Sequence, residues 1–149
     1  MFKWRDFYLM KIYDSKNKYI GVVEDISIDF YKGVVRGFTI SPTSIFKKQM
    51  YVSVDSIISI DEDMKIKGTS NFEGLKFKEI RYVDIINKEK KLIGVLEDLI
   101  IDKQNFEIKG ITLKHCTLCD EYILYNGNSR VKLKTLPHNL GGDSDVQKV

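Results

Sequence analysis

The stretch HCTLC at residues 115–119 contains the side chains best suited to chemistry. Cys116 and Cys119 have the C-x-x-C spacing of two zinc thiolates, and His115 would add an imidazole nitrogen. A structural zinc site needs four ligands, however, and the sequence has no second C-x-x-C or H-x-x-x-H segment. A thioredoxin-like redox pair needs a βαβ setting, which the surrounding pattern does not predict. We therefore interpret the two cysteines as small apolar residues of a turn and expect neither metal nor other cofactor.

Two acidic pairs, Glu24–Asp25 and Glu97–Asp98, are the other candidates for chemistry. Glu24 and Glu97 are in phase with apolar neighbours, where an unpaired carboxylate would be costly to bury. One interpretation is a general acid or a metal ligand, but no histidine or second carboxylate cluster recurs at matching spacing. We favour a strand that bends and carries the glutamate to its rim, with Asp25 and Asp98 fixing a turn or bulge. The sequence therefore predicts a protein that is not an enzyme.

Basic and aromatic residues alternate in FKWRDFY at residues 2–8, as they do where proteins stack single-stranded nucleic acid. The formal net charge of +3 is too small to indicate nucleic-acid binding by itself. Alternation of lysine with valine and leucine is also typical of a half-exposed strand. RNA binding is the alternative function, and it requires one set of side chains to converge on a single face. That set is Lys3, Arg5, Lys47, Lys48, Arg130, Lys132 and Lys134.

The sequence pattern of the elements that must position these residues occurs twice in the chain. IGVVEDISID begins at Ile20 and IGVLEDLIID begins at Ile93, so the two stretches are 73 residues apart. Without a gap, 9 of 21 positions are identical between residues 20–40 and 93–113. This spacing exceeds the roughly 20–50 residues of solenoid repeats, so we predict a duplicated small domain.

Each copy has the pattern of β structure. Polar runs at residues 14–18 and 87–91 predict turns before the long repeated strands. Alternation then predicts that one face of the first long strand is apolar, with Gly21, Asp25, Ser27 and Asp29 opposite. The residues predicted on the apolar face are Ile20, Val22, Ile26, Ile28 and Phe30. In the following strands, Gly37 and Gly110 mark β-bulges that would sharpen the twist and help a small sheet to curl.

The two copies differ at their C-terminal ends. The first continues with a strand pattern in which Val52, Val54, Ile58 and Ile60 alternate with polar residues. The second has no counterpart and instead offers EYILYNGNSRVKLK, with a predicted hairpin turn at Asn126–Gly127. Its barrel would close differently, or take a strand from the first copy or from a second subunit.

Composition is that of an ordinary globular chain. With 149 residues and 43% hydrophobic content, it can bury one core or two small ones. The N-terminus lacks the apolar centre of a signal peptide, and no apolar run reaches the roughly 18 residues that span a bilayer. We expect a cytoplasmic protein without a membrane span.

The repeated pattern G-V-x-x-D-x-x-I-D, followed by a short turn and a glycine-marked strand, resembles the PRC-barrel family. The resemblance runs from Phe7 to Ile66 and again from Ile80 to Leu113. This small β-barrel occurs in the reaction-centre H subunit, in the C-terminal domain of a ribosome maturation factor and in short proteins of spore-forming bacteria. The matching positions include the repeated motif residues Gly21, Asp25, Asp29, Gly37, Gly94, Asp98, Asp102 and Gly110.

The resemblance implies an all-β fold of two tandem, strongly bent antiparallel barrels, the second divergent at its C-terminal end. The expected division is a first barrel at residues 1–67, a linker and repeat start at 68–79, a second barrel at 80–136 and a mobile tail at 137–149. Family members are mostly adaptors without catalytic residues. The resemblance therefore implies a bacterial protein-binding module that docks through a sheet face or edge strand, with a homodimer left open and an RNA- or ribosome-associated assembly factor as the alternative.

Overall fold

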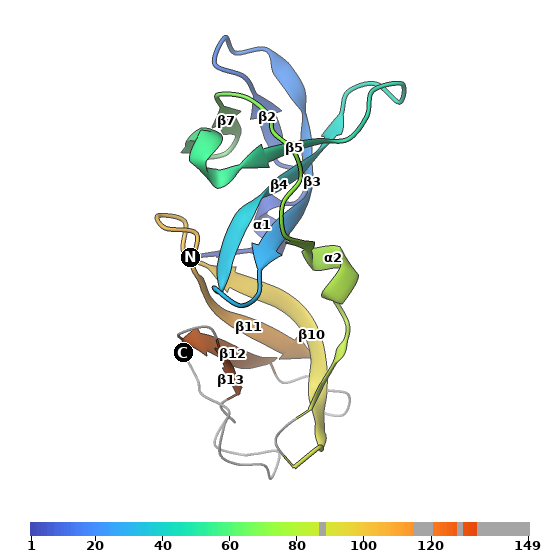
Figure 1. Ribbon diagram of the computed structural model, residues 1–149, viewed down its shortest axis with the longest axis vertical. Helices are drawn as coiled ribbons and strands as arrows, with labels where there is room; N and C mark the ends of the chain where they lie inside the picture. The colour runs from blue at the N-terminus through green and yellow to red at the C-terminus, as the bar shows by residue number, and fades with distance from the viewer. Residues whose placement is uncertain (87–88, 115–120, 128–129, 134–149) are drawn as a thin grey trace. The chain divides into compact units, whose positions relative to one another are not determined.

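Strands dominate the structure, which confirms the expected all-β class (Figure 1). The computed structural model describes residues 1–86, 89–114, 121–127 and 130–133. The helical elements within these ranges are single turns: α1 (Trp4–Phe7), the 3-10 turn η1 (Val54–Ser56) and α2 (Phe77–Ile80). No helix in the described part of the chain is both long enough and apolar enough to cross a bilayer.

The strands form two sheets, each in its own compact unit. Their bounds are β1 (Phe2–Lys3), β2 (Lys11–Tyr13), β3 (Tyr19–Asp29), β4 (Val34–Pro42), β5 (Met50–Ser53), β6 (Ile57–Ile60), β7 (Met64–Ile66), β8 (Leu75–Lys76), β9 (Asp84–Ile86), β10 (Leu92–Ile101), β11 (Ile108–Lys114), β12 (Glu121–Gly127) and β13 (Arg130–Leu133). One unit contains residues 4–29 and 35–78; the other contains residues 1–3, 30–34 and 79–149.

The unit of residues 4–29 and 35–78 is built on a sharply curled sheet. Its seven strands have the order β5-β4-β3-β2-β7-β6, and β8 pairs with β3. The end strands β5 and β6 are consecutive in the chain and joined only by η1. Because a three-residue connection spans so little distance, the two ends of the sheet must approach each other, which gives a half-barrel.

The core of this unit lies on the concave side of the curl. Buried apolar side chains come from every long strand of the unit and from α1 and α2. They are Trp4, Phe7, Ile12, Val23, Ile26, Ile28, Val35, Phe38, Ile40, Tyr51, Val52, Ile60, Met64, Ile66 and Phe77. Burial of this apolar surface is the main force that holds the curled sheet closed.

The predicted alternation of β3 is wrong in its first half. Gly21, Val23 and Asp25 are buried there, whereas Val22 is half-buried. The buried positions change phase between Asp25 and Ile26, so that Ile26 and Ile28 face the core as predicted. A strand that bends sharply cannot keep one strict two-residue period along its whole length. The predicted core residue Phe30 lies beyond the strand and is 48% exposed.

The predicted continuous strand around residues 52–60 is also interrupted. The turn η1 begins where Ser53 Oγ accepts a hydrogen bond from Asp55 N–H (3.4 Å), a local bond that competes with strand pairing. Val52 and Ile60 are buried on either side of the turn, but Ile58 is 46% exposed.

The second unit is a six-stranded sheet of order β1-β10-β11-β12-β13, with β9 also on β10. Strand β1 comes from the start of the chain, and Phe2 pairs with Ile101. The second sheet therefore does take a strand from the first part of the sequence. Its buried side chains among the described residues include Leu96, Leu99, Ile101, Ile108, Ile111 and Leu113.

The hairpin expected near the end of the chain is present, but its predicted turn is misplaced. Asn126 pairs with Val131 and Gly127 pairs with Arg130, so both residues of the predicted turn belong to β12. In this register Leu124 pairs with Leu133, whereas a turn at Asn126–Gly127 would set Leu124 opposite a serine. The apolar pattern outweighs the local turn preference here.

Backbone geometry recurs at the spacing of 73 residues. Leu9 N–H donates to Val23 O (2.9 Å), and Tyr82 N–H donates to Leu96 O (2.7 Å). The pairing of Lys76 with Ser27 in one sheet corresponds in the same way to the pairing of Lys3 with Ile100 in the other. Residues with positive φ also recur as pairs: Leu9 and Tyr82, Asn17 and Lys90, and Gly33 and Phe106.

Two bulges bend the β10–β11 ladder. Glu97 is the extra residue between the pairs Leu96–Leu113 and Asp98–Thr112. A second shift places Lys109 outside the pairing, directly before Gly110, so the bulge expected at this glycine is present. Because of the extra residue at Lys109, Ile108, Ile111 and Leu113 are all buried, although strict alternation would place Ile108 opposite Ile111 and Leu113.

Gly21 and Gly94 allow a second strand to lie unusually close to the long strands. A Cβ atom on Gly21 would stand 2.1 Å from the carbonyl oxygen of Ser41, and one on Gly94 would stand 2.8 Å from that of Lys114. The two oxygens are again 73 residues apart in sequence. Glycine is required here because backbone occupies the space of a side chain.

We predict that Gly21→Ala lowers the free energy of unfolding by about 2 kcal/mol or more, because the new methyl group overlaps backbone that cannot move independently. Gly68→Ala is the matched control, since nothing lies within 4 Å of a Cβ atom at that position. Urea unfolding of the two variants measures the difference. Equal stability of Gly21→Ala and Gly68→Ala would show that the close approach does not exist.

Candidate docking surfaces

The first acidic pair contributes a buried carboxylate that ties three segments together. Asp25 is 2% exposed. Its Oδ1 accepts hydrogen bonds from Trp4 Nε1–H and from Ile26 N–H, both at 2.9 Å. Its Oδ2 accepts from Lys78 N–H at 3.0 Å. Because all three donors are fixed by the fold, Asp25 acts as a structural anchor.

Aromatic side chains surround the Asp25 carboxylate and help to shield it from water. The Trp4 ring stacks on Tyr8 with centroids 5.0 Å apart and contacts Phe77 at 5.7 Å. The ammonium group of Lys78 lies 4.8 Å from the centroid of the Tyr8 ring, a cation–π contact. Desolvation by this burial raises the pKa of the Asp25 carboxyl, although the three hydrogen bonds and the nearby Lys78 charge act in the opposite direction.

The remaining acidic motif residues lie at strand bends and turns. Asp98 is fully buried, and its Oδ1 accepts from Leu99 N–H (2.7 Å), the bond that corresponds to Asp25 with Ile26. Asp102 Oδ1 accepts from Gln104 N–H (2.8 Å) in the turn before β11. Asp29 ends β3 and is half-buried. The Glu24 carboxylate accepts from the Gln49 side-chain amide and is not buried with the core.

The two glycines of the shorter repeated strands are buried within their ladders. Gly37 pairs with Ser53, and a Cβ atom there would stand 2.2 Å from Val52 O. Gly110 pairs with Ile100 beside the second bulge. The motif residues therefore shape the sheets, and none of these contacts forms a catalytic arrangement.

The cysteine motif cannot be placed. Cys116, Cys119 and His115 lie outside the described residues. Among the residues that are described, no group of three or more His, Cys, Asp or Glu side chains is arranged to hold a metal ion.

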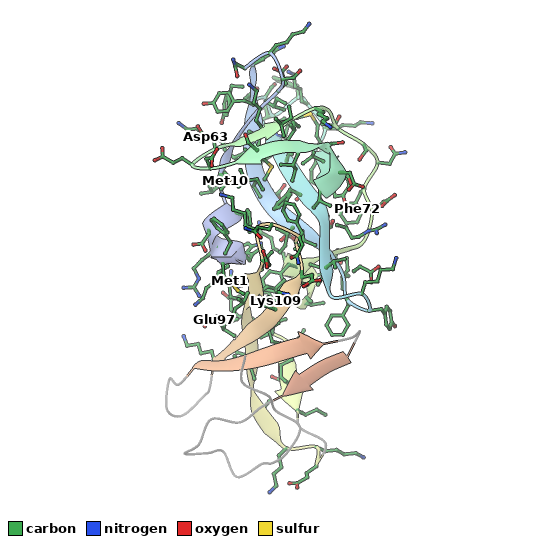
Figure 2. The ribbon with its side chains drawn as sticks, turned by 90° about the vertical axis from the view of Figure 1, so that its left-hand side faces the viewer. Met1, Met10, Asp63, Phe72, Glu97 and Lys109 are labelled. Atoms are coloured by element: carbon green, nitrogen blue, oxygen red, sulfur yellow. The ribbon has the colours of Figure 1, made fainter. Side chains whose placement is uncertain are left out.

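An open groove runs beside strand β5. Ser70 N–H donates to Tyr51 O (2.8 Å), which holds the segment of residues 69–72 next to the outer edge of the strand. Between them is a cavity of about 530 Å³. Phe72, labelled in Figure 2, is 44% exposed and meets the Tyr51 ring edge-on at 5.3 Å. The lining residues are Thr39, Gln49, Met50, Tyr51, Thr69, Ser70, Asn71, Phe72 and Lys76.

The loop between β4 and β5 presents two apolar side chains to solvent. Ile45 is 93% exposed and Phe46 is 91% exposed. Lys47 N–H donates to Ser44 O (3.1 Å), so the two apolar residues are the central pair of a tight turn. Sequence reasoning missed this feature, because the stretch SPTSIFKKQ has the composition of an ordinary connection, and Lys47 and Lys48 were considered only as members of the basic set.

The basic residues expected to converge lie on several elements. Arg5 is on α1, and Lys47 and Lys48 follow the exposed apolar turn. Lys3 is on β1, which belongs to the other unit. Arg130 and Lys132 are in β13, and Lys134 lies outside the described residues. Convergence on one face remains a prediction.

Burial of Asp25 gives a testable pH dependence. Its pKa lies above the ordinary value of 3.8 in the folded chain, so the folded state binds the proton more tightly than the unfolded state. The stabilisation that protonation provides is fully present below the unfolded pKa and is lost as pH rises through the folded pKa. We predict that, as pH rises above the ordinary value of 3.8 and through the raised folded pKa, the wild type loses stability relative to Asp25→Asn, which has no proton to release. Parallel urea-unfolding profiles for the two chains across this range would contradict the prediction.

Comparison with known proteins supports a barrel module in the first part of the chain. No curated protein matches the sequence. The buried Asp25, the closely approached Gly21 and the strands β2 to β7 of the half-barrel fall within the region that a family model recognises. That model is the PRC-barrel domain, and it matches residues 1–70.

Proposed function

We propose that the chain is a non-enzymatic protein-binding adaptor that docks a partner at a sheet edge. The groove beside β5 is the observation that carries this proposal. Its size falls within the roughly 300–1,000 Å³ of small recognition sites, and its walls combine aromatic surface with hydroxyl, amide and ammonium groups. An extended peptide needs both kinds of surface. Its main-chain groups form hydrogen bonds with polar groups of the site, and its alternate side chains pack into apolar pockets.

We infer further that the chain is a tandem duplication of the PRC-type barrel, although the family match covers residues 1–70 alone. The support is geometric: equivalent hydrogen bonds, positive-φ residues and glycine contacts recur 73 residues apart. Two related modules on one chain would engage two sites and gain avidity from the high effective concentration of the second. The second module differs after β11, where β12 and β13 form a hairpin, so its docking edge need not share the first one's specificity.

The internal bonding of the acidic motif supports binding over catalysis. Asp25 is 2% exposed and accepts hydrogen bonds from three donors of the fold, whereas a general acid or base needs access to a reacting proton. The PRC-barrel domain is in general a non-catalytic module. These two points favour an adaptor within the bacterial cytoplasm over an enzyme.

The proposal predicts that Phe72→Ala reduces partner recovery at least tenfold when the full chain is used as bait in a lysate of its native cell. The physical reason is loss of the aromatic wall of the groove. Tyr31→Ala is the matched control, because Tyr31 is an 80% exposed aromatic residue outside the groove. Quantitative mass spectrometry of the recovered proteins gives the measurement.

Equal recovery by all three baits would contradict docking at this groove. Recovery of ribosomal subunits that is abolished by ribonuclease and falls steeply with salt would instead favour the alternative, an RNA- or ribosome-associated assembly factor.

A further inference from the structure

The turn at residues 44–47 places apolar residues where polar ones are usual. Central positions of tight turns are dominated by Gly, Asn, Asp, Pro and Ser, because the tip of a turn faces water. Here they are Ile45 and Phe46, and the rest of the molecule covers less than a tenth of either. Two hydrogen bonds to Ser44 define the turn, one from Lys47 N–H to the carbonyl oxygen and one from Phe46 N–H to Oγ (3.3 Å). The exposure of Ile45 and Phe46 is therefore a consequence of a hydrogen-bonded turn.

The charges around this tip have one sign. Lys47 and Lys48 follow directly, and residues 43–49 contain no acidic residue. Both lysines are exposed, and neither ammonium group has a carboxylate partner among the described residues. The carboxylate at the base of the loop, Glu24, is already engaged by the Gln49 amide, and Lys76 Nζ donates to the same amide's oxygen (3.2 Å).

We propose that this tip, Ile45–Lys48, inserts into the interface of an anionic lipid membrane. The apolar pair would enter the boundary between headgroups and acyl chains, while the two ammonium groups would contact lipid phosphates. A bilayer fits this tip better than a folded protein does. A stable protein interface needs a contiguous patch of roughly 800 Å² per partner, whereas the neighbours of this pair, Thr43, Lys47, Lys48 and Gln49, are all exposed and hydrophilic. A lipid surface is deformable and needs no complementary pocket.

The attachment would be peripheral and reversible, since two side chains and two charges give far less membrane affinity than a spanning helix. Figure 1 shows the loop as the turquoise hairpin that extends from the ends of β4 and β5, away from the curled part of its sheet. This inference does not rest on the proposed docking groove, because none of the residues Ile45–Lys48 lines that groove.

Co-sedimentation of the full chain with vesicles tests the proposal. One set is pure phosphatidylcholine, and the other contains about one third phosphatidylglycerol. We expect binding to the anionic set, with weaker binding to the neutral set and a decrease as salt rises. The double variant Ile45→Ser/Phe46→Ser should lower the partition coefficient for anionic vesicles at least tenfold, and Lys47→Gln/Lys48→Gln should lower it about tenfold and abolish the preference for anionic lipid.

Two matched variants control for general hydrophobicity and charge. Tyr31→Ser removes an exposed apolar side chain elsewhere, and Lys16→Gln/Lys18→Gln removes two exposed charges from the β2–β3 loop. Both should bind vesicles as the wild type does, and thermal unfolding confirms that every variant is folded. Failure of the wild type to bind anionic vesicles, or equal loss of binding in the control variants, would overturn the proposal. So would the finding that the tip variants lose a captured protein while vesicle binding is absent.

Discussion

The carboxylate of Asp25 is the constraint on which the first unit depends. A carboxylate with 2% exposure is tolerated only when its oxygens are fully hydrogen-bonded, since unpaired burial of an ionised group costs several kcal/mol. Its donors come from the beginning of the chain, from β3 itself and from the start of α2, at Trp4, Ile26 and Lys78. The hydrogen bond from Lys78 thus joins β3 to a residue 53 positions away in sequence. The strand β8, which directly precedes α2, pairs with β3 in the same region.

Curvature is the second requirement, and it comes from backbone rather than from side-chain packing alone. Glycine at position 21 lets the Ser41 carbonyl reach the strand, and bulges at Glu97 and Lys109 bend the second ladder. Strands β5 and β6 are the two end strands of one sheet, and curling brings them close enough for a single 3-10 turn to join them. An edge beside β5 is left for the segment of residues 69–72, so the groove is a consequence of incomplete closure.

Much of this architecture can be predicted from the sequence, because glycine and aspartate leave local signals. The repeat, the all-β class and the bulge at Gly110 follow from spacing and alternation. Which side chains in the first half of β3 face the core could not be predicted, because strict alternation of buried and exposed residues fails where the strand bends at Asp25. The turn assigned to Asn126–Gly127 was wrong because strand register depends on distant partners.

The docking features were harder still to predict. Phe72 lines a groove only because Ser70 binds Tyr51, a tertiary contact that no local pattern encodes. The exposure of Ile45 and Phe46 likewise depends on where β4 and β5 end, since the same residues in a strand would be assigned to a core. The lysines beside them stand out in the sequence, but their relation to the apolar pair does not.

Residues 75–78 are an integral part of the unit of residues 4–29 and 35–78, and Asp25 anchors them there. Native-state hydrogen exchange of the full chain tests it most directly at the amide of Lys78. The account predicts that the opening free energy of this amide is within about 1 kcal/mol of that of Val23, whose N–H donates to Met10 O in the same unit. Exchange of the Lys78 amide at the rate of an unprotected peptide, while Val23 stays protected, would contradict it.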